Sequence, residues 1–294
     1  MKRLTLLLAM AMLCTVAYAQ NDTVRVIKER NDTMRIGNIL IIKKGKRGSG
    51  NDSSSIVMKR TYSSRRSNSK VSTNFFVLDL GFANYNDQTN YANPGGYLVN
   101  RPGSPAFSGN DFKLRTGKSV NVNIWFFMQR LSLVKRNINL KYGLGLELNN
   151  YRFKSNISFK ENGVIPYSGG AQTTGAFIFR DSISFSKNKL AADYLTVPLM
   201  LNFASNRASS KKGVSLSVGV SAGYLYSQRN KQRSDERGKE KNKGEYDLER
   251  FKLSYVAELG LGPVRLYGSY SPKSMFEHTL DIKPYTVGIR LSNW

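Results

Sequence analysis

Between residue 74 and the end of the chain, apolar residues recur at every second position in eight separate segments. In one of them, Leu140, Leu144 and Leu148 alternate with Lys141 and Gly145. Successive side chains of a β-strand point to opposite faces of the sheet, so each segment has one apolar face and one polar or small face. The pattern predicts eight β-strands, at residues 75–83, 119–129, 138–149, 194–203, 214–221, 251–261, 264–271 and 285–292.

The same alternation assigns individual side chains to a face. In the second segment, Ile124 and Met128 fall on the apolar face, and Asn123 and Trp125 fall on the opposite face. We treat Met128 as a packing residue on the apolar face, because a thioether adapts to irregular gaps.

The connections between the segments alternate in length, which indicates how the strands are joined. The long ones are polar and cover roughly residues 86–116, 154–188, 228–250 and 271–283, and the short ones cover residues 130–137, 204–213 and 262–263. Outer-membrane barrels have short periplasmic turns and longer extracellular loops. We therefore expect an all-β fold over residues 74–294, an eight-stranded antiparallel up-and-down transmembrane β-barrel with both termini in the periplasm.

A soluble β-sandwich or lipocalin-like barrel would show similar alternation, because it hides its apolar face inside. The polar face of the segments argues against this alternative, since it carries too many charges for a sandwich core. Inside a narrow polar barrel, three acids and four bases can pair across the lumen. The expected lumen charge network consists of Asp79, Lys141, Glu147, Lys252, Glu258, Arg265 and Arg290.

A helical membrane protein is excluded by the length of the apolar segments. After the first 19 residues, no stretch of the sequence approaches the roughly 20 consecutive apolar residues that a helical span requires. Only a closed barrel then satisfies every backbone group within lipid.

The first 19 residues have the pattern of a signal peptide, and the protein is expected to be exported. Lys2 and Arg3 precede an apolar run, and Ala17 and Ala19 form an A-x-A cleavage site. An N-terminal anchor helix is the alternative. Residues 20–73 form a basic, partly flexible periplasmic extension, in which the segment from Asn21 to Arg25 returns as Asn31 to Arg35. This repeat is either a β-hairpin or polar low-complexity sequence.

The chain carries 45 Lys and Arg residues against 20 Asp and Glu residues, a net charge of +25. Export separates this charge from nucleic acid, so we expect no nucleic-acid partner and instead contact with outer-membrane lipids, including glycolipid phosphates. The loop at residues 228–250 has 8 basic and 6 acidic residues. It is either a solvated loop or a surface that meets anionic glycolipid head groups.

Several stretches resemble the PorT-like outer-membrane β-barrel family of Gram-negative bacteria. They are residues 76–82, 142–153, 188–199 and 219–224, and residues 22–38 are similar to the strand-like leader that often precedes such barrels. The resemblance implies an outer-membrane barrel of the cell envelope, handled by the outer-membrane assembly machinery and able to meet other envelope proteins. The namesake of the family supports protein secretion and gliding. The terminal Trp294 is aromatic, as an assembly signal requires, but out of phase with Leu291.

Candidate chemistry is sparse. The only cysteine, Cys14, lies in the predicted signal peptide, and the only histidine is His278. This leaves no residues for most zinc or iron sites, and we expect no cofactor. His278 lies in the last long loop near Ser274, Glu277 and Asp281, which makes a surface acyltransferase or protease a remote alternative. Because no nucleophile motif such as G-x-S-x-G accompanies it, we expect no enzyme.

An eight-stranded barrel is only wide enough for side chains, which makes a diffusion pore unfavourable. The sequence therefore favours a structural, adhesive or envelope-assembly role, with a narrow channel for small solutes as the main alternative. Leu144→Arg should impair assembly because it places a charge in lipid, and Glu147→Leu should destabilise the lumen. Gly145→Ser should be milder, because a hydroxyl can find partners in a polar interior.

Overall fold

The computed structural model describes residues 33–36, 39–44 and 55–60 as backbone strands, and residues 70–134, 137–205, 213–262 and 264–292 with their side chains. The chain divides into two compact units, Met1–Asn68 and Ser69–Trp294. The predicted signal peptide, the first copy of the repeat and Trp294 lie outside the described residues.

In the first unit, three short strands form an antiparallel sheet in the order β1-β2-β3. They are β1 (Thr33–Ile36), β2 (Ile39–Lys44) and β3 (Ser55–Arg60). β1 contains part of the second copy of the repeat, and β1 and β2 pair in register as a hairpin. The expectation of one or two short strands around residues 36–42 therefore falls on this hairpin.

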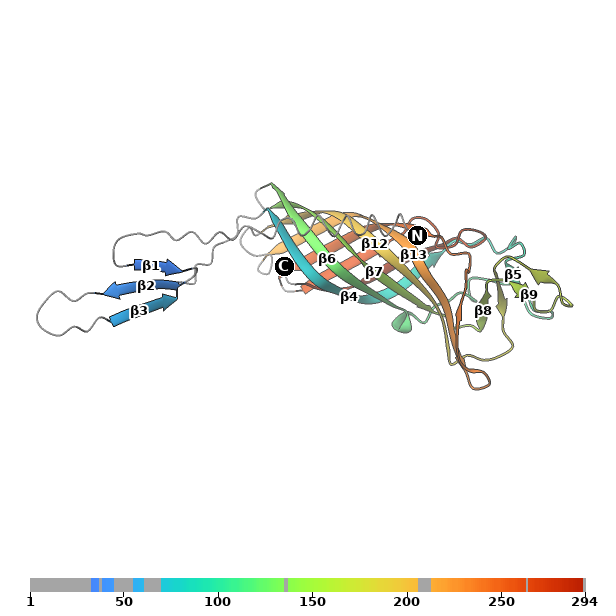
Figure 1. The fold of residues 1–294 in the computed structure, drawn as a ribbon. Helices are drawn as coiled ribbons and strands as arrows, with labels where there is room; N and C mark the ends of the chain where they lie inside the picture. Colours follow the sequence, from blue (N-terminus) through green and yellow to red (C-terminus); the bar gives the residue numbers. More distant parts are fainter. Residues whose placement is uncertain are drawn as a thin grey trace, which may run out of the picture. The chain divides into compact units, whose positions relative to one another are not determined.

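The second unit is built from eight long antiparallel strands, which Figure 1 shows as a steeply twisted cylinder. They are β4 (Val71–Asp87), β6 (Val120–Val134), β7 (Ile138–Arg152), β12 (Lys187–Ala204), β13 (Val214–Ser234), β15 (Phe251–Leu261), β16 (Val264–Tyr270) and β17 (Ile282–Leu291). β12 pairs with both β7 and β13, and β17 pairs with β4, so the ring closes. The predicted eight-stranded antiparallel barrel is confirmed, although β4 begins at Val71 rather than near residue 74.

The two faces of the barrel differ as the alternation predicts. Along β7 every second residue is buried, with Lys141 and Glu147 inside and Leu144 on the outer face. On the other strands, the outer face carries large exposed apolar residues, such as Leu199 and Val218. Among the described residues, no helix is long and apolar enough to span a membrane.

One side chain assigned to the outer face lies inside. Met128 is fully buried in a small cluster with Val77, Trp125 and Met200. The cause is a β-bulge in β6 between Trp125 and Phe127, where the pairing with β7 gains an extra residue. Because side chains alternate with a period of two, one extra residue exchanges the faces of every position that follows it.

The long connections are more ordered than polar loops would be. They contain a three-stranded sheet of β5 (Leu98–Val99), β11 (Phe177–Arg180) and β8 (Ile157–Lys160), and a short hairpin of β9 (Gly163–Val164) and β10 (Gln172–Thr173). β14 (Gly238–Lys243) adds to the outer part of β13, and η1 (Thr116–Lys118) precedes β6. Figure 1 shows β5, β8 and β9 beyond one end of the cylinder.

We call this assembly of long connections the cap, and it has its own apolar core. An aromatic chain runs through it, with ring centroids 6.5 Å apart for Phe112 and Phe153, 5.6 Å for Phe153 and Phe159, and 6.0 Å for Phe159 and Tyr246. All four side chains are buried. Burial of several aromatic rings is a large stabilising contribution, so the cap is a folded structure.

Candidate functional site: the charged lumen and the cap

The centre of the lumen is an ion-pair cluster around Arg290 of β17. Its Nε donates to Asp79 Oδ1 at 2.7 Å, and its Nη2 donates to Asp79 Oδ2 at 2.8 Å. Its Nη1 donates to Glu258 Oε2 at 2.5 Å. Arg290 is 5% exposed and Asp79 is fully buried. Two-point contact of a guanidinium with a carboxylate fixes both geometry and register.

Glu258 of β15 connects this pair to the opposite wall. It accepts from Lys141 Nζ at 2.7 Å and from Arg265 Nη1 at 3.0 Å, in addition to Arg290. Three cations therefore surround one carboxylate, and they come from β7, β16 and β17. Removing one partner from such a buried cluster leaves an uncompensated charge and costs about 3–5 kcal/mol.

Glu147 and Lys252 form a second ion pair in the lumen, also between β7 and β15. Glu147 accepts a further hydrogen bond from Asn149 Nδ2 at 2.9 Å, and the Thr196 hydroxyl lies 3.4 Å from it. All seven side chains expected in the lumen thus lie inside the barrel. The structure divides them into two groups, five residues around Arg290 and Glu258 and two residues at Glu147 and Lys252.

Neutral polar side chains complete the network, and the sequence analysis did not single them out. Asn121 Nδ2 donates to Asn149 Oδ1 at 2.8 Å, and Asn139 Nδ2 donates to Asn202 Oδ1 at 3.1 Å. Trp125 Nε1 donates to Asp79 Oδ2 at 2.7 Å. The signal for these residues was present, because they share the parity of the charged positions on their strands.

Little space remains between these side chains. The lumen cavity lined by Trp125, Glu147, Met200, Tyr267 and Arg290 has a volume of about 30 Å³. One water molecule occupies roughly 30 Å³ in the liquid. The described lumen is therefore packed with side chains at this level.

Glycines allow strands and aromatic rings to approach closely inside the barrel. A Cβ added to Gly145 would lie 2.6 Å from the Ile124 carbonyl oxygen and 2.7 Å from Cε3 of Trp125. Real Cβ atoms do not approach other atoms so closely, and one of the obstacles is backbone. The expectation that Gly145→Ser is mild is therefore wrong, because the Trp125 ring fills the space that a hydroxymethyl group needs.

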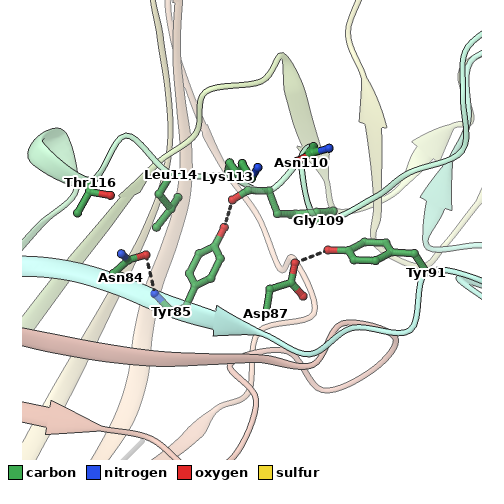
Figure 2. A pocket seen from close by; sticks show the side chains of 10 residues that line it. Asn84, Tyr85, Asp87, Tyr91, Gly109, Asn110, Lys113, Leu114 and Thr116 are labelled. Atoms are coloured by element: carbon green, nitrogen blue, oxygen red, sulfur yellow. Dashed lines mark hydrogen bonds between the residues drawn. The ribbon is translucent and has the colours of Figure 1, made fainter.

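An open pocket lies at the base of the cap, beside the end of β4. Its volume is about 490 Å³, and Tyr85, Asp87, Tyr91 and Lys113 are among its lining residues. Figure 2 shows the Tyr91 hydroxyl pointing at Asp87, to which it donates at 2.6 Å. The Tyr85 hydroxyl donates to the carbonyl oxygen of Phe112. Both phenols are thus engaged in holding the cap to the barrel rim.

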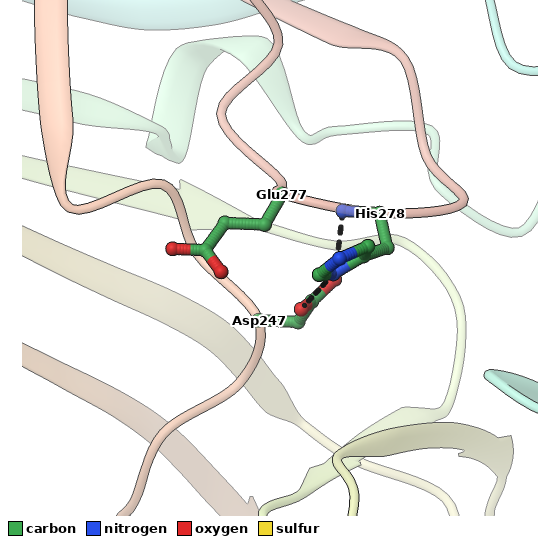
Figure 3. Close-up of side chains that lie close together, drawn as sticks. All are labelled: Asp247, Glu277 and His278. Atoms are coloured by element: carbon green, nitrogen blue, oxygen red, sulfur yellow. Dashed lines mark hydrogen bonds and ion pairs between the residues drawn. The ribbon is translucent and has the colours of Figure 1, made fainter.

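His278 is paired with a residue that the sequence analysis did not consider. Its Nδ1 lies 2.8 Å from Asp247 Oδ1, and its backbone N–H donates to Asp247 Oδ2 at 3.0 Å (Figure 3). Ser274 Oγ instead donates to the Leu280 carbonyl oxygen at 2.7 Å. The hydrogen bond to Asp247 raises the pKa of His278 above its usual 6.5. No described contact joins Ser274, His278 and Asp281 into a catalytic arrangement.

Asp247, Glu277 and His278 are nevertheless close together. One ligand atom from each lies within 4.8 Å of the others, as Figure 3 shows for their side chains. One imidazole nitrogen and two carboxylate oxygens are donors that divalent transition metals accept. The side chain of His278 is largely exposed, so the group sits on the surface of the cap.

A closed antiparallel barrel with an apolar outer face and a charged, packed lumen defines the class of outer-membrane β-barrel proteins. The chain belongs to the family described as "Outer membrane protein beta-barrel domain", whose model matches residues 81–272. No curated protein matches the chain.

Among solved structures, the crystal structure of Ail, the attachment invasion locus protein of Yersinia pestis, is similar to this chain. The match has 11% sequence identity and a TM-score of 0.27, and it covers 74% of this chain and 98% of Ail. At this TM-score, the match supports no conclusion about function.

Proposed function

We propose that this protein is a non-conducting outer-membrane barrel that acts through its folded cap, in a structural, adhesive or envelope-assembly role. The observation that carries the proposal is the packed lumen, in which buried ion pairs leave a cavity of about 30 Å³. A pore needs a continuous water-filled path, and eight strands leave room for little more than side chains. The ordered surface available for partners is then the cap.

The proposal places the cap outside the cell and both termini, with the basic extension, in the periplasm. Its support is the even number of strands and the gathering of the long connections at one end of the barrel. Membership in a PorT-like subgroup and the signal peptide at residues 1–19 are part of the same proposal, supported by the sequence stretches given above. The assembly machinery of the outer membrane and other envelope proteins are the partners that it implies.

Conductance across a planar bilayer tests the proposal. Purified protein should first show heat-modifiable gel mobility, which reports a folded barrel. It should then give no stable single-channel currents under conditions in which a wide porin conducts. Steady currents from the folded protein would support the narrow channel instead, which is favoured by the charged lining of the lumen.

The proposal assigns no catalytic role to His278. Its support is that the nearest nucleophile candidate, Ser274, uses its hydroxyl to hold the loop through Leu280 and the Phe276 backbone N–H. Lipase and protease assays on native protein and on His278→Ala should give no activity above background in either case. Activity of the native protein that disappears in the variant would overturn this part of the proposal.

A further inference from the structure

The outer part of the barrel wall carries a dense array of cations on one face, which we call the basic face. It extends over β7, β12, β13 and β14 and consists of Arg152, Lys187, Lys189, Arg229, Lys231, Arg233, Lys239, Lys241 and Lys243. The residues between them, such as Asn188, Asn230 and Gln232, are buried on the opposite face. The cations therefore point outward from the wall.

Strand register sets these cations directly opposite one another. Arg152 pairs with Lys189, Lys189 with Lys231, and Lys231 with Lys241, which makes one row across four strands. Lys187, Arg233 and Lys239 form a second row in the same way. Like charges directly opposite each other on neighbouring strands are destabilising. An arrangement of this kind is stabilised when anions lie over it.

The protein itself supplies few anions to this face. Among residues described with side chains, Arg229 is the member of the basic face that forms an ion pair, and its partner is Asp193. The Nε atoms of Arg152 and Arg229 are buried and have no hydrogen-bond acceptor. Lys187, Arg233, Lys239, Lys241 and Lys243 are exposed. The face thus has donors and charge to offer to a ligand.

The position along β13 indicates where this ligand lies. Exposed apolar residues run from Val214 to Tyr226, with Tyr224 and Tyr226 as exposed aromatics at the end of the run. Twelve steps of about 3.3 Å cover about 40 Å of strand, which at a tilt of about 40° is roughly 30 Å of depth. This equals the hydrocarbon thickness of a bilayer, so Arg229 and Lys231 follow immediately at head-group level.

We propose that the basic face binds the phosphate groups of glycolipids in the outer leaflet. Neighbouring strands are about 4.8 Å apart, so one phosphate can accept hydrogen bonds from cations on two strands at once. The inference rests on the proposed function in one respect, the placement of the cap outside the cell. It adds the ligand class and the residues that hold it.

Lipid retention by full-length protein in detergent–lipid micelles tests the inference. Native protein should retain bisphosphorylated lipid A at least tenfold better than lipid A from which the phosphates have been removed, because each surface cation contributes to attraction of anionic lipid. The triple variant Lys187→Gln/Lys231→Gln/Lys241→Gln should lose at least tenfold in retention of the bisphosphorylated form. Native mass spectrometry measures the bound lipid directly.

A matched variant separates this site from general charge. Lys118→Gln/Lys154→Gln/Lys160→Gln removes the same charge from exposed positions of the cap outside the basic face. It should retain lipid A as the native protein does, and both triple variants should keep heat-modifiable mobility. Equal losses in the two variants, or no preference for the phosphorylated lipid, would overturn the inference. Full displacement of lipid A by millimolar inorganic phosphate would also overturn it, because it would indicate a site for the free ion.

The orientation is tested separately. The expected mature chain has no cysteine, so Asp235→Cys in the β13–β14 turn gives a single labelling site. Labelling of intact cells by a membrane-impermeant maleimide is the expected result. Failure of labelling with lipid retention intact would overturn the orientation while leaving the phosphate-binding face in place.

Discussion

Arg290 and Asp79 are paired in register between the last and the first strand of the barrel, and their side chains form a two-point ion pair. The seam at which the barrel closes is thus held inside by a buried charge pair as well as by the backbone ladder. A misplaced register would leave both charges without partners, which is costly in a buried environment. The pair therefore favours one way of closing the barrel.

Asp79→Ala should destabilise the folded barrel by about 3–5 kcal/mol, because it leaves Arg290 buried without its main partner. Urea unfolding in detergent, followed by tryptophan fluorescence, measures the loss. The double variant Asp79→Ala/Arg290→Ala should recover part of the stability, because no unpaired guanidinium remains at the seam. A double variant as unstable as the sum of the two single variants would show that the pair contributes no coupling.

Glu147→Leu should cost about 3–5 kcal/mol, since Lys252 would remain in the lumen without a carboxylate. The matched control is Glu245→Leu in the cap, where the partner Arg250 is exposed. An exposed ion pair contributes about 0–1 kcal/mol, so this variant should unfold almost as the native protein does. Similar losses in both variants would contradict the assignment of Glu147 to the interior.

Gly145→Ala should abolish or strongly reduce assembly, because its Cβ would lie 2.6 Å from the Ile124 carbonyl oxygen. Gly268→Ala is the matched control, as its Cβ would lie 3.4 Å from the Thr286 carbonyl oxygen, an ordinary contact. The yield of heat-modifiable protein in purified outer membranes measures both. Normal assembly of Gly145→Ala would mean that Trp125 does not occupy the space against this glycine.

Leu144→Arg should also reduce assembly, for a different reason. Leu144 is on the outer face of β7, where an arginine at the bilayer midplane costs about 2–4 kcal/mol. Leu144→Met should assemble normally because it keeps an apolar side chain on this face. Equal yields for the two variants would show that this position does not meet lipid.

The pKa of His278 should lie above 6.5, because its hydrogen bond with Asp247 favours the protonated ring. The contribution of this contact to stability is fully present below pH 6.5 and is lost as the pH rises through the raised pKa. As the chain has one histidine, its ring resonance can be titrated by NMR without ambiguity. Asp247→Asn should return the pKa towards 6.5, and an unchanged titration would contradict the pairing.

The eight strands and the inner face could be predicted because both follow from a period of two. Lys141, Glu258 and Arg290 lie far apart in the sequence, but each shares the polar face of its strand, and a narrow barrel brings such faces together. Met128 was misassigned because a bulge two residues earlier changes the parity. A bulge leaves no mark in a pattern of apolar and polar residues when the inserted residue, Phe126, is itself apolar.

The cap could not be predicted in the same way. Phe112, Phe153 and Phe159 come from two different connections and follow no common period, so their burial depends on how the connections fold together. The contact between Asp247 and His278 has the same origin, because it joins residues 31 positions apart in two loops. Close packing at Gly145 was also invisible, since it depends on the neighbouring Trp125 ring.

The pairing of β17 with β4 also determines when maturation can finish. The two partners of the seam ion pair are separated by 211 positions, nearly the whole length of the barrel unit. Contacts of such separation form late, because the chain between them must first be gathered. A chain whose synthesis or export stops before β17 keeps two open sheet edges, which are available to chaperones and proteases. Closure of the barrel therefore acts as a check that export of the whole polypeptide is complete.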